Sequence, residues 1–183
     1  MRIDQLRKAY ALQVKWTAFP LHPDIPEDGL SLAELFKGTN IDVNKVGARL
    51  SDAASELGLP MGEREKTYNT RLAQELAKWG EDKGKGDALH RALFRAYFVD
   101  GRNIGKIDEL VTVAEGLGLS GGEARKALAS RMYKDAVDAD WARAKEIGIT
   151  AVPTFAMNQG KITGAQPYEA LEKFIKANFL PNG

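Results

Sequence analysis

The middle of the chain, from about residue 42 to residue 146, carries apolar residues at intervals of three and four. This spacing places them along one face of a helix, so it predicts a run of helices without a convincing strand. Asp42 and Ser120 stand where helix N-caps are expected, and Glu123 completes the spacing of a capping box. Helices are expected at about 31–36, 42–57, 72–79, 89–98, 106–117, 120–128 and 133–147.

Both ends of the chain show a different pattern. Residues 13–19 alternate between polar and apolar side chains, which predicts a strand after a helical segment at 2–11. Near the other end, the runs 154–157 and 161–163 flank a polar turn and predict two short strands. An amphipathic segment that ends near Phe179 predicts a last helix.

Strands at the two ends of a chain, with helices between them, are typical of one discontinuous α/β domain that holds an all-helical insertion. We therefore expect the α/β domain to comprise residues 1–30 and 148–183. The helical insertion is expected at residues 31–147.

Composition excludes several classes of function. The 183 residues include 26 Lys and Arg against 25 Asp and Glu, and this net charge of +1 gives no electrostatic argument for a nucleic-acid or membrane partner. No apolar run is long enough to span a bilayer, and the first residues do not resemble a signal peptide, so we expect a cytoplasmic protein. The chain has no cysteine, and its two histidines, His22 and His90, lack metal-ligand spacing, so no metal site is expected.

Four stretches carry a family resemblance. They are Trp-Thr-Ala-Phe-Pro-Leu-His-Pro-Asp at 16–24, Leu-Phe-Arg-Ala-Tyr-Phe at 93–98 with Gly-Arg-Asn-Ile at 101–104, Gly-Ile-Thr-Ala-Val-Pro-Thr-Phe at 148–155, and Gly-Ala-Gln-Pro at 164–167. Together they resemble the DsbA-like thioredoxin family, specifically its FrnE-like branch, over essentially the whole chain. The resemblance implies a thioredoxin-like α/β domain with an all-helical insertion.

The chain departs from this family at its beginning. Members begin with a strand followed by a Cys-x-x-Cys turn, or by a version of that turn with serine, whereas this chain begins inside the helix that follows. No catalytic residue can therefore be carried over, and we expect the authentic start to lie upstream of Met1. A sheet without its first, central strand leaves on the order of ten backbone groups unpaired. Closure of its neighbours, a strand from a second copy in a homodimer, or water would satisfy those groups.

The best candidate site is the segment Ala151, Val152 and Pro153. An X-Pro bond permits a cis peptide, and the resemblance implies a cis-proline loop that pairs with an extended peptide or with glutathione. The alternative is a trans proline that begins an edge strand. The resemblance places Gln166 at a glutathione-contacting loop, although a helix start explains it as well. It also places His22 in a loop that lines the same cleft.

The resemblance implies a thiol–disulfide oxidoreductase of the DsbA/FrnE type that is catalytically incomplete, so whether the chain is an enzyme stays open. Its expected partner is a peptide or protein thiol, with no cofactor. One alternative is a glutathione-dependent isomerase or transferase, similar to 2-hydroxychromene-2-carboxylate isomerase and kappa-class glutathione transferases, with glutathione as cosubstrate. Another alternative is a non-catalytic peptide-binding module.

Overall fold

The structure is a computed structural model that describes residues 2–62 and 64–179. The chain divides into two compact units, one formed by residues 1–21 and 139–183 and the other by residues 22–138. The sequence placed the boundaries at residues 30 and 147 instead. Residues 22–30 therefore fall in the second unit, and residues 139–147 fall in the first.

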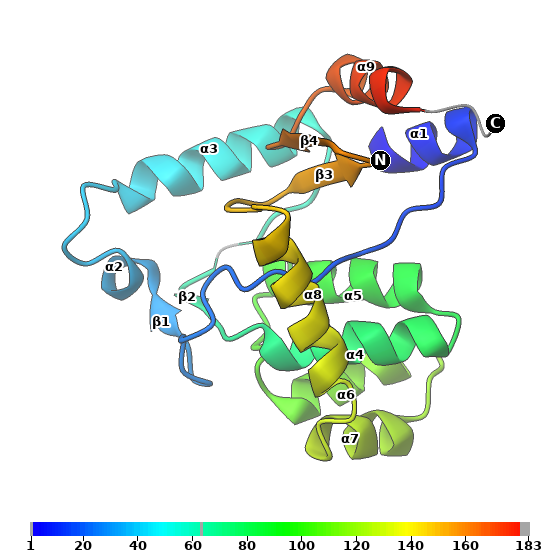
Figure 1. Ribbon diagram of the computed structural model, residues 1–183. Helices are drawn as coiled ribbons and strands as arrows, with labels where there is room; N and C mark the ends of the chain where they lie inside the picture. Colours follow the sequence, from blue (N-terminus) through cyan, green and yellow to red (C-terminus); the bar gives the residue numbers. More distant parts are fainter. Residues whose placement is uncertain (1, 63, 180–183) are drawn as a thin grey trace. The chain divides into compact units, whose positions relative to one another are not determined.

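The first unit is built around a hairpin and two helices, which Figure 1 shows. Its elements are α1 (Arg2–Tyr10), the greater part of α8 (Lys134–Glu146), β3 (Thr154–Met157), β4 (Gly160–Thr163) and α9 (Tyr168–Asn178). The strands pair antiparallel, with Thr154 opposite Thr163 and Met157 opposite Gly160. Asn158 turns the hairpin at a φ of 52°, a conformation that asparagine tolerates better than most residues.

The core of this unit is small. Leu6 of α1 packs against Leu171 and Ile175 of α9, and all three side chains are at most 7% exposed. Phe155 of β3 and Ile162 of β4 cover this cluster from the hairpin. The amphipathic patterns at the two ends of the chain therefore meet in one core, as their spacing predicts.

The strand expected at residues 13–19 is wrong, because this segment joins no sheet in the described part of the chain. Alternating side chains are not sufficient for a strand, since a strand also needs a neighbour that completes its hydrogen-bond ladder. The described residues place no such neighbour beside it, and β3 does not close up to take that role. The Ala18 N–H instead donates to the carboxylate of Asp140 in α8, at 2.8 Å, and Asp140 is only 7% exposed.

The second unit is predominantly helical. Its elements are β1 (Leu30–Ser31), α2 (Leu32–Leu35), α3 (Val43–Glu56), β2 (Lys66–Thr67), α4 (Arg71–Asp82), α5 (Gly86–Phe98), α6 (Ile107–Glu115) and α7 (Gly121–Ala129). The expected caps are present, since the Asp42 carboxylate accepts from the Lys45 N–H and the Ser120 hydroxyl accepts from the Glu123 N–H. One expectation is wrong, because Lys66–Thr67 pairs antiparallel with Leu30–Ser31 inside the region predicted to lack strands.

Helices α4–α7 form the main core. Leu76 of α4, Leu89 of α5 and Leu110 of α6 are fully buried, and Trp79 is 3% exposed. Gly80 lets α4 approach α5, since a Cβ at this position would lie 2.5 Å from the Cδ2 atom of Leu89. A larger residue at position 80 would therefore force the Leu89 side chain to shift.

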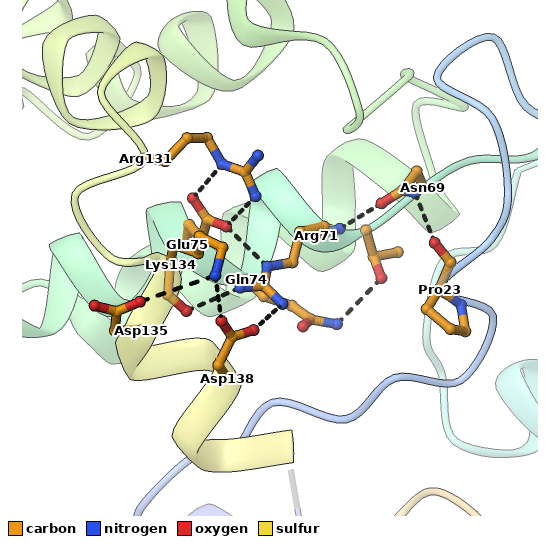
Figure 2. A network of polar contacts seen from close by, with 10 residues as sticks. Pro23, Asn69, Arg71, Gln74, Glu75, Arg131, Lys134, Asp135 and Asp138 are labelled. Atoms are coloured by element: carbon orange, nitrogen blue, oxygen red, sulfur yellow. Dashed lines mark hydrogen bonds and ion pairs between the residues drawn. The ribbon is translucent and has the colours of Figure 1, made fainter. Parts of the chain in front are cut away.

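A network of charged side chains joins α4 to the loop after α7 and to the start of α8, as Figure 2 shows. Glu75 is 2% exposed and accepts hydrogen bonds from Arg131 at 2.9 and 2.7 Å and from Arg71 at 2.8 Å. Arg71 also pairs with Asp138 at 2.7 Å. The amide of Asn69, at the start of the same helix, donates to the carbonyls of Pro23 and Ile25 and so fixes the proline-rich loop.

Candidate functional site

The segment Ala151–Pro153 lies between α8 and β3 and is exposed, with Val152 at 44%. The peptide bond between Val152 and Pro153 is cis. Contacts on both sides hold the segment in place, because the Thr154 hydroxyl donates to the Ala151 carbonyl at 2.7 Å and the Gly164 N–H donates to the Pro153 carbonyl at 2.8 Å.

The backbone polar groups of Val152 are available to a ligand. Among the residues that the structure describes, neither its N–H nor its C=O makes a hydrogen bond. Both groups belong to an exposed residue that lies two positions before Thr154, the first residue of β3. A residue with both backbone groups available can exchange two hydrogen bonds with one residue of an extended chain.

A cavity of about 480 Å³ lies within the same unit. It is lined by Phe19, Pro20, Trp141, Ala142, Lys145, Gly148, Ile149 and Thr150. Its walls are aromatic and aliphatic, and the amino group of Lys145 is the cationic group among them. Thr150 of the lining directly precedes Ala151, so the cavity lining and Val152 are separated by one residue along the chain.

Gln166 has a structural role at the end of β4. Its side-chain amide donates to the Thr163 carbonyl at 2.6 Å, and its own backbone carbonyl accepts from Arg2 at 3.0 Å. The backbone N–H of Gln166 donates to Gly164, and the N-cap of α9 is Pro167. These contacts match the helix-start interpretation.

His22 belongs to the second unit, whereas Val152 belongs to the first. Its ring is half-buried and meets the ring of Phe36 edge to face, with centroids 6.3 Å apart. The role predicted for His22 as a substrate contact therefore stays a prediction.

The titratable groups with shifted pKa values in the first unit lie on α1 and α9. The Tyr10 hydroxyl donates to Glu172 at 2.7 Å, which raises the pKa of Tyr10 and lowers the pKa of Glu172. Lys176 lies beside both groups, and its pKa is raised by the same contacts. This arrangement locks α1 to α9 and places no tuned acid or base at Ala151–Pro153.

No cluster of three or more His, Asp or Glu side chains suited to a metal ion is found in the described residues. In the same part of the chain, every helix is too short or too polar to cross a bilayer. The site therefore offers backbone pairing groups, an apolar cavity and one lysine.

Sequence reasoning missed the cavity. Trp141 reads as one more apolar position of a helix, and Phe19 as the end of a strand. The two residues are 122 positions apart in the numbering, so only the fold brings them together. No local pattern in the sequence signals this pairing.

Comparisons with known proteins identify the family and the fold. Residues 1–176 match the family model of the DSBA-like thioredoxin domain. The structure is similar to a probable DsbA oxidoreductase from Streptomyces coelicolor, with a TM-score of 0.87 and 26% identity over 100% of this chain and 85% of that one. It is also similar to a 2-hydroxychromene-2-carboxylate isomerase, with a TM-score of 0.74 and 20% identity over 96% of this chain and 84% of that one.

A curated relative covers less of the chain. Uncharacterized protein YwbO of Bacillus subtilis (strain 168) is 37% identical over 107 residues, which are 58% of this chain. The match spans 54% of that protein, so the chain corresponds to about half the length of this relative.

Proposed function

We propose that this chain, which belongs to the DsbA-like thioredoxin family, docks an extended polypeptide segment that carries a thiol or disulfide along Ala151–Pro153. The observation that carries the proposal is the exposed Val152, whose N–H and C=O have no partner in the described part of the chain. An extended segment would satisfy both groups at once, which is the usual mode of strand addition to a sheet edge.

The cavity beside Val152 supports a preference among such segments. Successive side chains of an extended ligand point to opposite sides. One of them would enter the cavity between Phe19 and Trp141, where an apolar side chain gains the most from burial. The amino group of Lys145 would favour an acidic residue or a terminal carboxylate at the cavity rim.

The chain contributes binding and orientation, and it contributes no thiol of its own because it contains no cysteine. The sulfur chemistry of thiol–disulfide exchange requires a thiolate that attacks a disulfide. Here the attacking thiolate, the disulfide sulfur that it attacks and the sulfur that leaves as a thiolate would all belong to the ligand or to another polypeptide. The chain's own residues would hold the ligand backbone in place beside β3.

A second candidate function is glutathione-dependent isomerisation or transfer. The absence of cysteine favours it, because a bound glutathione would supply the thiol that the chain lacks. Glutathione is a short extended peptide with carboxylates, so it fits the same backbone groups and Lys145. In this case Gln166 and His22 remain proposed contacts of the ligand.

The proposal predicts a specific pattern of hydrogen bonds with the ligand. The experiment titrates ¹⁵N-labelled protein with a leucine-containing octapeptide and with a series of the same peptide N-methylated at one position at a time. We expect amide shifts at Ala151, Val152 and Thr154. Affinity should fall at the one N-methyl position whose N–H pairs with Val152 and change little at its two neighbours, because successive N–H groups of an extended strand point to opposite sides.

A pair of variants tests the cavity. Trp141→Ala should weaken binding of the leucine peptide and leave a glycine-containing version unchanged, while Trp16→Ala serves as the matched control outside the cavity lining. Uniform sensitivity along the N-methyl series, or shifts that avoid Val152, would contradict the docking proposal. If reduced glutathione shifts the amide resonance of Val152 and none of the peptides does so, the second candidate function is favoured.

A further inference from the structure

Helix α3 is amphipathic, yet its apolar side is exposed. Val46 and Leu50 are 37% and 46% exposed, and Leu57, which directly follows the helix, is 43% exposed. Within the described part of the chain, α3 contributes no residue to either buried core, and in its own unit it stands apart from the bundle of α4–α7 (Figure 1). A continuous apolar face of this kind normally packs against another element or a partner.

The spacing of this apolar face is that of a helix–helix seam. Val43, Val46, Leu50, Ala53 and Leu57 follow one another at intervals of three, four, three and four residues. This is the repeat by which two helices pack along their lengths. The face therefore fits a second helix of similar length.

The charges along α3 identify that helix. The first half carries Lys45 and Arg49, and the second half carries Asp52 and Glu56. Arg49 and Glu56 are exposed, and in the described part of the chain no ion pair involves either of them. Each of them directly precedes a leucine of the seam, Leu50 or Leu57, so both flank it at equivalent positions.

An antiparallel copy of α3 matches these charges. It would place Arg49 beside Glu56 of the partner subunit, and a two-fold axis would repeat the pair at the other end. A parallel copy in register would place Arg49 beside Ala54 of the partner subunit, so it would not form this charge pair. The basic first half of one α3 therefore faces the acidic second half of the other when the two helices run antiparallel.

We propose that two copies of this chain associate through α3, packed antiparallel along the seam from Val46 to Leu57, so that Leu50 of each copy faces Ala53 of the partner subunit. Gly47 and Ala54 flank the seam on its other side, and a Cβ at Gly47 would meet nothing within 4 Å in the chain itself, so the small residues leave room for a close partner backbone. One helix from each copy buries less than the ~800 Å² per partner of a standard interface, so the dimer is weak and reversible, with a Kd on the order of micromolar.

The test is analytical ultracentrifugation over a concentration series. We expect the wild type to change from monomer to dimer as the concentration rises. Leu50→Lys should abolish the dimer and leave the circular dichroism spectrum unchanged, because Leu50 is already 46% exposed in the monomer. Arg49→Glu and Glu56→Arg should each raise the Kd roughly tenfold, since each turns two symmetric attractions into repulsions.

Charge complementation makes the test specific to an antiparallel pair. The double variant Arg49→Glu/Glu56→Arg should recover the wild-type Kd, and an equimolar mixture of the two single variants should form a heterodimer. A wild type that stays monomeric at all concentrations would overturn the proposal and leave the face to a different partner. A dimer that persists in Leu50→Lys, or a double variant as weak as the singles, would overturn it as well.

Discussion

Replacing Glu75 by glutamine should destabilise the helical unit more than any surface charge substitution. Glu75 is 2% exposed and receives three hydrogen bonds from Arg71 and Arg131. Glutamine has the same shape but presents an amide N–H₂ to guanidinium donors, so at least one contact becomes donor against donor. The two arginines would then lose a buried counter-charge.

The magnitude follows from the exposure of the partners. Breaking a buried ion pair by removing one member costs about 3–5 kcal/mol. Arg131 is 44% exposed and Arg71 keeps its contact with Asp138, so water and a second carboxylate compensate in part. We therefore expect a loss of about 2–3 kcal/mol in the free energy of unfolding, which is a large part of the ~5–15 kcal/mol typical of a domain.

The assay is urea denaturation followed by tryptophan fluorescence. Trp79 is buried in the same unit as Glu75, whereas Trp16 and Trp141 belong to the other unit. In a background with Trp16→Phe and Trp141→Phe, the signal reports the helical unit alone. The matched control is Glu123→Gln, which breaks the exposed pair with Lys83 and should cost less than about 1 kcal/mol.

The pH dependence gives a second check. Burial alone would raise the pKa of Glu75, but hydrogen bonds from Arg131 and Arg71 outweigh it, so the pKa lies below its ordinary value. A carboxylate with a lowered folded-state pKa stabilises the fold above its unfolded pKa, and this contribution is lost as the pH falls through the folded value. The difference between wild type and Glu75→Gln should therefore shrink at acid pH. A cost no larger than that of Glu123→Gln, or a difference independent of pH, would refute the reasoning.

Two further predictions concern single hydrogen bonds. Asp140→Asn removes the charged acceptor of the Ala18 N–H. We therefore expect faster hydrogen exchange of the Ala18 amide and a loss of about 1.5–3 kcal/mol in the free energy of unfolding of the first unit. An unchanged exchange rate would show that Asp140 does not hold this segment. The Tyr133 hydroxyl donates to Asp82 at 2.6 Å, and this hydrogen bond, followed by burial, raises the pKa of Tyr133 to about 12. Asp82→Asn should bring that pKa back toward 10 in an ultraviolet titration, and a midpoint that stays near 12 would assign the shift to burial instead.

The helices were predictable because their signals are local. Ser31 caps α2 and forms both hydrogen bonds of a capping box. Asp42 caps α3 and accepts a hydrogen bond from the N–H of Lys45, three residues later. Each cap and its helix lie within a few residues of one another, so the chain itself contains the whole interaction. The hairpin at residues 154–163 is local in the same sense, because its two strands are joined by a short turn.

The features that the sequence did not predict depend on residues that are far apart along the chain. The alternation at residues 13–19 identifies which side chains share a face, but a strand exists only where another strand lies beside it. The same holds for Glu75, which reads as a surface position of an amphipathic helix until Arg131, 56 residues later, covers it. The cavity between Phe19 and Trp141 needs both segments at once. No local pattern in the sequence records such pairs.

The docking proposal and the dimer proposal can be separated, because they use different units. Val152 and its cavity belong to the unit of residues 1–21 and 139–183, whereas α3 belongs to the unit of residues 22–138. Arg49→Glu should therefore raise the Kd of the dimer and leave peptide binding at Val152 unchanged. Trp141→Ala should do the reverse. If either variant changed both measurements, the two units would be coupled, and the binding free energy of one site would include the other.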